Sequence, residues 1–333
     1  WRYLIERDNG VTNFHFELSA DLLQDEDITL LRKARPGLFQ FEIGVQSTFA
    51  PTLRAIHRSH RVEKIFHRVR QVAELGNIHQ HLDLIAGLPL ENFSTFGKSF
   101  DEVFALHPQQ LQLGFLKLLR GSGLDQRREE LGLICSSQPP YEVLSTPDLS
   151  FSDLIRLKGV EDMVERYYNS GRFQLSLSHA LSYFPSPFCF FESLSTYWTN
   201  QGHDGISHSK ESLYDILHDF VRDCFGPDDD LPWLMKFDLY FHENAKKLPQ
   251  CGQESLFSRY RDRISSFYRD PVQIRRYLPS YEGLDPRQIA RITHLEVFPF
   301  DPLHPEIRQD TAYLFDYRCK TRLQDSTATP ISL

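Results

Sequence analysis

The chain has 333 residues, 41% of them hydrophobic, and its 45 acidic and 37 basic side chains produce a formal net charge of −8. This length predicts about two domains, and the negative charge does not favour nucleic acid as a partner. No run approaches the roughly 20 apolar residues of a membrane span, and the opening WRYLIERDNG lacks the pattern of a signal peptide. We therefore expect a cytoplasmic protein without a membrane partner.

Five cysteines are scattered singly through the chain, at positions 135, 189, 224, 251 and 319. No two have the short spacing of zinc or cluster motifs, so we interpret them as unpaired, buried thiols and expect no metal ligands in this chain. An odd number without a secretory signal also argues against a disulfide framework. Because the first residue is Trp1 rather than Met, we interpret the chain as a fragment of a longer protein.

Four segments in the first third of the chain alternate apolar and polar residues, and each is followed by a helical stretch: residues 13–19, 38–47, 79–88 and 110–119. Repetition of strand and helix predicts an α/β fold in which crossover helices join parallel strands. Apolar residues recur at helical spacing from Val62 to Ala73 and from Phe96 to Phe104, and Pro108 should close the second of these helices.

Each predicted strand divides into an apolar and a polar face, because successive side chains point to opposite sides of a strand. The polar faces carry His15, Glu17 and Ser19; Gln40, Glu42, Gly44 and Gln46; His79, His81 and Asp83; and Gln110, Gln112 and Gly114. A barrel interior is normally packed with branched apolar side chains, and burying an unpartnered polar group costs several kcal/mol. We therefore predict a wide, open barrel that holds a large polar ligand. Four strands cannot close a barrel, so we expect more strands upstream.

The segments FHFELSAD, FEIGVQS, HLDLIAGLP and QLQLGFLKLLRGSGL resemble the third to sixth strands of a radical S-adenosylmethionine (SAM) enzyme. The resemblance covers residues 1–124 and implies the carboxy-terminal part of a partial TIM barrel. It is strongest to the branch that includes oxygen-independent coproporphyrinogen oxidase and many cobalamin-dependent members. It implies that Glu17, Gln46, Arg58 and Asp83 contact bound S-adenosylmethionine.

The chemistry of these four residues agrees with that role. A ribose offers two hydroxyl groups, which suit the carboxylate of Asp83 and the amide of Gln46. Glu17 can accept a hydrogen bond from the methionine ammonium group, and Arg58 can pair with its carboxylate through a forked contact. We expect the three strand residues to point into the barrel from its polar face.

Gly87, in the turn after the third strand, completes the predicted site because a glycine would let the backbone approach the adenosine closely. Arg54 and Arg61 lie near Arg58 in the sequence and could replace it. Taken singly, a carboxylate at a strand end is also typical of a helix cap or of a solvated side chain. The prediction therefore depends on the four residues together.

The family's [4Fe–4S] cluster sits on a CxxxCxxC loop, and none of the 333 residues match that motif. The resemblance implies that the cluster reductively cleaves S-adenosylmethionine to a deoxyadenosyl radical, or that the enzyme supports cobalamin-dependent methyl transfer. It also implies an electron donor such as flavodoxin or ferredoxin, and a small molecule or unknown substrate. We expect the cluster cysteines and a cobalamin domain upstream of Trp1, so that this fragment alone is inactive.

The rest of the chain predicts a linker over residues 125–150 and a mainly helical α+β module over residues 151–333. Helices are expected at residues 151–169, 174–183, 188–200, 210–224 and 254–268, and the runs THLEVFPFD and TAYLFDYRC predict an antiparallel β ribbon. The arrangement resembles the uncharacterised carboxy-terminal module of some cobalamin-binding radical enzymes. We interpret its aromatic segment SYFPSPFCFFESLSTYW as core rather than as a surface for a flat ligand.

Two other functions fit the same residues. A metal-dependent hydrolase on a TIM-type barrel could bind zinc through His79 and His81, together with Asp83 and His15. Alternatively, the chain could be a degenerate, non-catalytic binding module that keeps the polar barrel and has lost the cluster loop.

Overall fold

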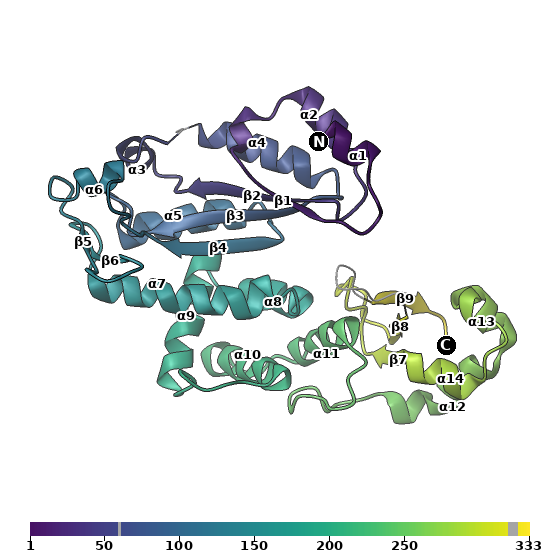
Figure 1. Cartoon of the computed structure of the whole chain (residues 1–333). Coiled ribbons are helices and arrows are strands. Elements are labelled where there is room, and N and C mark those ends of the chain that lie inside the picture. The colour runs from purple at the N-terminus through teal and green to yellow at the C-terminus, as the bar shows by residue number, and fades with distance from the viewer. Residues whose placement is uncertain (59–60, 319–325) are drawn as a thin grey trace. The chain divides into compact units, whose positions relative to one another are not determined.

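A computed structural model describes residues 1–58, 61–318 and 326–333. These residues form two compact units, each built from segments that are separated in the sequence (Figure 1). The first unit contains Trp1–Gly171 and Phe184–Asp204, and the second contains Arg172–Tyr183 and Gly205–Leu333. The predicted division into barrel part, linker and carboxy-terminal module stays a prediction, because compact units need not coincide with domains of separate origin.

A parallel sheet of four strands organises the first unit (Figure 1). Its strands are β1 (Phe14–Leu18), β2 (Phe39–Gln46), β3 (His79–Ala86) and β4 (Gln110–Phe115), and they lie side by side in chain order. Each neighbouring pair is parallel. The four predicted strands and the α/β class are therefore confirmed, and the strands form an open sheet.

Helices between the strands cover the apolar face of this sheet. The longest are α4 (Val62–Ala73) and α5 (Phe93–Phe104), which match the predicted helices, and α5 begins at Asn92, whose side chain accepts a hydrogen bond from the Thr95 amide. Shorter helical segments are α1 (Arg2–Glu6), η1 (Ala20–Leu22), α2 (Asp25–Leu31) and α3 (Ala50–Ala55). Alternating side chains of β2 are fully buried on this face: Phe39, Phe41, Ile43 and Val45.

The opposite face of the sheet is more accessible, as the alternation predicted. His15, Glu17, His79 and Gln112 are exposed, and Gln40, Glu42 and Asp83 are half-buried. His81 and Gln46 are the buried members of the face. The strands thus present a polar surface beside a closely packed apolar one.

The rest of the first unit contains short elements followed by two long helices. The predicted linker holds α6 (Gly123–Gln126) and an antiparallel pair of very short strands, β5 (Ile134–Cys135) and β6 (Val143–Ser145). The helix predicted over residues 151–169 is α7 (Phe151–Met163), which continues as the π-helical segment η2 (Val164–Asn169). Helix α9 (Pro187–Asn200) buries Phe188, Phe190, Phe191 and Trp198, so core packing is confirmed for these four aromatic residues, whereas Tyr183 of the same segment is exposed.

The second unit is helical and ends in a small antiparallel sheet. Its helices are α8 (Gln174–Leu181), α10 (Lys210–Phe225), α11 (Leu231–His242), α12 (Phe257–Arg269), α13 (Pro271–Tyr277), η3 (Pro279–Tyr281) and α14 (Pro286–Ile292). The predicted ribbon is β7 (Thr293–Phe298) paired with β8 (Thr311–Asp316), and β9 (Thr327–Ile331) adds a third strand that the sequence pattern did not predict.

The cysteines differ in part from their prediction. Cys135, Cys189, Cys224 and Cys251 are free thiols, as expected, but none of these four is fully buried and Cys224 is exposed. They lie at half-buried or surface positions of the two units, so the prediction of burial was wrong. Cys319 lies outside the described residues. Within the described ranges, no helix is both long and apolar enough to span a membrane.

Candidate functional site

Strand register brings the predicted site residues of the polar face together. Glu17 of β1 pairs in register with Glu42 of β2, and Gly44 of β2 pairs with Asp83 of β3. Residues two apart along a strand point to the same face. Glu17, Glu42 and Asp83 therefore form a row of carboxyl groups across three neighbouring strands.

Asp83 lies at the β3 end of this row, where its charged form is disfavoured. Burial raises the pKa of Asp83 to about 7, and the charge of Glu42, a hydrogen bond with Glu42 and the charge of Glu17 add to that effect. Its Oδ1 atom is buried and has no hydrogen-bond partner among the described residues. A buried carboxylate oxygen without a partner is costly in a folded protein, so Asp83 keeps an acceptor ready for a donor from outside the chain.

Gln46 and Arg58 meet over Gly44, where the chain leaves the sheet. Gln46 ends β2 with a left-handed φ of 70°, and the strand register shifts between Gly44 and Gln46. A Cβ atom on Gly44 would lie 2.1 Å from Gln46 Nε2 and 3.7 Å from Arg58 Nη2. The absence of a side chain at Gly44 therefore lets the amide fold back over the strand. Gln46 Oε1 is also buried and accepts no hydrogen bond within the described part of the chain.

Backbone conformation and packing explain why residue 87 is a glycine. It follows β3 with a φ of 86°, and a Cβ atom there would lie 2.4 Å from Cγ1 of Val143 in β6. Glycine is needed at this turn because other residues rarely adopt a positive φ and because β6 packs closely against it. Its predicted contact with adenosine remains a prediction.

The three histidines of the polar face lie next to this row of carboxyl groups. His15 Nε2 lies 2.9 Å from Glu42 Oε2, and His81 Nε2 lies 2.7 Å from Gln40 Nε2. Burial, with the neighbouring His79 and His15, lowers the pKa of His81 to about 4, so its ring is neutral at pH 7. In residues 1–58, 61–318 and 326–333, no group of three His, Cys, Asp or Glu side chains is arranged to hold a metal ion.

A buried glutamate that the sequence analysis did not single out supports the two loops of the site. Glu91, 2% exposed, accepts hydrogen bonds from Ser47 Oγ at 2.7 Å and from Ser99 Oγ at 2.9 Å. Burial raises its pKa to about 7, although both hydroxyl groups act in the opposite direction. Because Ser47 follows Gln46 directly, Glu91 links the turn after β2 to the loop after β3. Its place in the segment GLPLEN was the available signal, but the sequence does not show which partners it meets.

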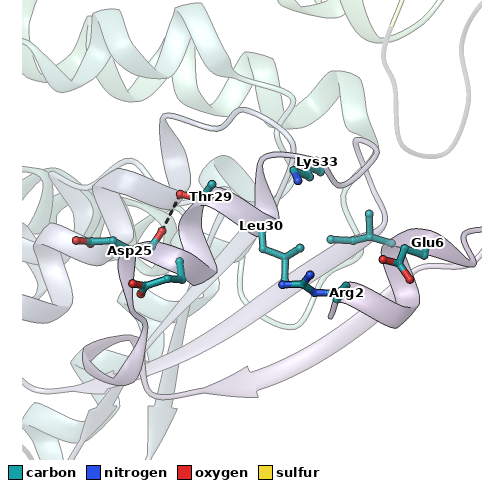
Figure 2. Close-up of a pocket in the computed structure, with 8 residues that line it drawn as sticks. Arg2, Glu6, Asp25, Thr29, Leu30 and Lys33 are labelled. Atoms are coloured by element: carbon teal, nitrogen blue, oxygen red, sulfur yellow. Dashed lines mark hydrogen bonds between the residues drawn. The ribbon is translucent and has the colours of Figure 1, made fainter.

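A cavity elsewhere in the first unit contains none of the predicted site residues. It lies between α1 and α2, has a volume of about 440 Å³ and is lined by charged side chains of both signs, including Arg2, Glu6, Asp25 and Lys33 (Figure 2). The Thr29 hydroxyl in its wall donates to the carbonyl oxygen of Asp25. These side chains lie on the helical side of the sheet, so this cavity is separate from the polar face.

Comparison with known proteins assigns more than half of the chain to a family. Residues 129–315 match the family described as "Protein of unknown function (DUF4080)". The chain belongs to this family. The match covers residues 129–150 of the predicted linker, α7 to α14, β5 to β7 and all but the last residue of β8, and it leaves out β1 to β4 with the candidate site. Membership in DUF4080 therefore says nothing about the residues of the polar face.

Individual relatives match parts of the DUF4080 protein. The chain is 29% identical over 110 residues to the oxygen-independent coproporphyrinogen-III oxidase-like protein HemZ of Bacillus subtilis, which is 33% of this chain and 22% of HemZ. Coproporphyrinogen III oxidase (HemN) of Escherichia coli, named as a radical SAM enzyme, aligns in structure over 48% of this chain and 41% of its own, at 19% identity and a TM-score of 0.31.

A second solved structure is the radical S-adenosylmethionine methyltransferase TsrM of Kitasatospora setae, with cobalamin and a [4Fe–4S] cluster bound. It aligns over 62% of this chain and 48% of its own, at 14% identity and a TM-score of 0.39. These likenesses concern the fold and are distant. The DUF4080 chain spans less than half the length of each of these three proteins.

Proposed function

We propose that this chain is the S-adenosylmethionine-binding part of a radical SAM enzyme, and that Glu17, Gln46, Arg58 and Asp83 bind the cofactor. The observation that carries the proposal is the pair of buried acceptors without partners, Asp83 Oδ1 and Gln46 Oε1. They belong to residues beside and above Gly44, and they match in number the two hydroxyl donors of a ribose. The sequence similarity to HemZ supports the same class of enzyme.

Each residue of the chain has a distinct task in this proposal. Asp83 and Gln46 accept hydrogen bonds from the ribose, which removes the cost of their two unpartnered atoms. Glu17 faces the ammonium group of the methionine part, and Arg58 pairs with its carboxylate. Glu17, Glu42 and Asp83 surround this position with negative charge, which favours a ligand with a sulfonium and an ammonium group over a neutral one.

When bound at a reduced [4Fe–4S] cluster, S-adenosylmethionine supplies a deoxyadenosyl radical, or it supports methyl transfer through cobalamin. The 333 residues contain no CxxxCxxC motif. We therefore propose that the cluster and any cobalamin are held by other parts of the full-length protein, and that a flavodoxin or ferredoxin supplies the electron. This chain's own residues bind and orient the cofactor.

Equilibrium dialysis of the purified chain with S-adenosylmethionine tests the binding step. We expect saturable binding by the unmodified chain, at least ~10-fold weaker binding by Asp83→Ala and by Gln46→Ala, and unchanged binding by Gln112→Ala. Gln112 is the matched control because it is exposed on the same face and pairs with Asp83 in register. Failure of the unmodified chain to bind, with an intact circular dichroism spectrum, contradicts the proposal.

The catalytic step is tested on the full-length protein, reconstituted anaerobically with iron and sulfide. Reduction in the presence of S-adenosylmethionine should release deoxyadenosine. If binding is intact but neither deoxyadenosine nor S-adenosylhomocysteine forms at a complete cluster with cobalamin supplied, the chain serves as a binding module instead. Stoichiometric zinc without iron in the full-length protein supports the hydrolase.

A further inference from the structure

In the proposed binding of the cofactor, Glu42 contributes only its negative charge, yet it lies at the centre of the row of carboxyl groups. It is on β2 between Glu17 on β1 and Asp83 on β3, and its side chain is 26% exposed. The sequence pattern placed it on the polar face without assigning it a role. Its contacts run to both neighbouring strands.

On one side Glu42 contacts His15, and on the other it contacts Asp83. His15 Nε2 lies 2.9 Å from Glu42 Oε2, and a hydrogen bond joins the carboxyl groups of Glu42 and Asp83. Strand register places Asp83 beside Gly44, two residues along β2 from Glu42 and on the same face of the sheet. The three side chains therefore lie next to one another across three strands, and Asp83 Oδ1 is the buried acceptor of this row.

We infer that Glu42 is a positioning residue for Asp83: His15 orients Glu42, and Glu42 holds Asp83 so that Oδ1 faces the ribose of the cofactor. The inference rests on the proposed function. A hydrogen bond between two carboxyl groups needs one proton, which one group donates and the other accepts. Glu42 can therefore control both the orientation of Asp83 and the pH at which Asp83 loses its proton.

The titratable groups around Glu42 and Asp83 show which of them can change the protonation of Asp83. Glu17 and His15 face it from β1, His79 and His81 from β3, and Arg58 from the segment after α3. Strand β4 contributes the uncharged Gln110 and Gln112 to the same face. Burial lowers the pKa values of both His79 and His81, so the two rings are neutral near pH 7. Glu42 is therefore the main charged neighbour whose removal changes Asp83.

Binding of S-adenosylmethionine between pH 6 and 8 tests the inference in Glu42→Gln, Glu42→Leu and the control Glu102→Gln, an exposed carboxylate on α5. The unmodified chain should bind more tightly as the pH rises, because ionised Asp83 accepts from the ribose. Glu42→Gln should bind well at both ends of this range, since its amide donates to Asp83 and removes a negative charge. Glu42→Leu should bind ~10-fold more weakly throughout, and Glu102→Gln should behave as the unmodified chain.

Carboxyl ¹³C NMR of the free protein separates this inference from the proposed function. Glu42→Gln should lower the pKa of Asp83, whereas His15→Gln, which keeps a donor to Glu42, should leave the titration of Asp83 near pH 7. If S-adenosylmethionine does not bind but the NMR shift occurs, the proposed function fails and the pairing of Glu42 with Asp83 stands. If the cofactor binds but Glu42→Leu matches the unmodified chain in affinity and pH profile, the positioning role of Glu42 is overturned.

Discussion

Two carboxyl groups that burial affects differ in their neighbours: Asp83, half-buried on the parallel sheet, and Glu296, buried on the antiparallel sheet. Glu296 is 4% exposed, yet its pKa is lowered, because His294 and Lys236 together outweigh the opposing effect of burial. Lys236 Nζ lies 3.2 Å from Glu296 Oε1, and His294 Nε2 lies 3.1 Å from Glu296 Oε2. Asp83 has carboxyl neighbours instead, and its pKa is raised to about 7.

The difference shows which buried charge serves the fold and which serves a ligand. Both oxygens of Glu296 have partners within the chain, so this carboxylate contributes to the fold of the second unit and needs no ligand. Asp83 keeps one oxygen without a partner among the described residues. A carboxyl group with an unpartnered buried oxygen destabilises the free protein, and such groups are typical of binding sites, where a ligand supplies the missing partner. We therefore expect the functional site on the polar face.

The largest effect on stability should come from breaking the buried ion pair between Lys236 and Glu296. Lys236→Met leaves Glu296 buried without its cation and should lower the free energy of unfolding by about 3–5 kcal/mol, measured by urea denaturation. Lys236→Met combined with Glu296→Leu should recover much of that loss. Arg275→Met is the matched control, because its ion pair with Glu282 is exposed, and it should leave stability nearly unchanged. Equal losses in both single variants would contradict the comparison.

Asp83→Asn should weaken binding of S-adenosylmethionine without lowering stability, the reverse of what we expect for Lys236→Met. It removes a strained negative charge, so the free energy of unfolding should stay the same or rise. Affinity for S-adenosylmethionine should fall by ~10–100-fold, since a charge-assisted hydrogen bond to the ribose is lost. Dialysis and urea denaturation of the same preparation measure both quantities. A large loss of stability would instead make Asp83 a structural residue like Glu296.

Gly44→Ala should affect binding more than stability. The new Cβ atom would lie 2.1 Å from Gln46 Nε2, but this atom is the end of a flexible side chain that can swing away. We expect a stability change below about 1 kcal/mol and ~2–10-fold weaker binding of S-adenosylmethionine. Gly114→Ala on β4 is the control, because its Cβ would meet Leu84 O at an ordinary 3.6 Å. Equal affinity in the two variants would remove Gln46 from the site.

The smallest effect is a dependence of stability on pH. The pKa of Asp83 rises from 3.8 to about 7 on folding, so in this window the folded chain binds more protons than the unfolded one. Its contribution to stability therefore falls as the pH rises through the window. The stability of Asp83→Asn relative to the unmodified chain should increase from pH 4.5 to 7 and then level off, measured by urea denaturation. A constant difference would mean that Asp83 titrates normally.

Most of the first unit could be predicted from its sequence, whereas parts of the second could not. The strands of the parallel sheet alternate Phe, Ile or Leu with polar residues, and this period is a local signal. Helix α11 was missed because nearly all of its side chains are buried, including Lys236 and Asp238, so it has no polar face to mark a helical period. Strand β9 contains Pro330 and was missed because it becomes a strand only by pairing with β8 at the edge of its sheet.

The candidate site divides in the same way. By itself the sequence determined that Glu17, Gln46 and Asp83 share one face of a parallel sheet, because alternation along a strand is a property of the backbone. Only the tertiary structure decided that Glu42 meets Asp83, that Gln46 folds back over Gly44 and that two acceptors remain buried without partners in the described chain. These features depend on strand register and on loops from distant segments, which no local pattern encodes.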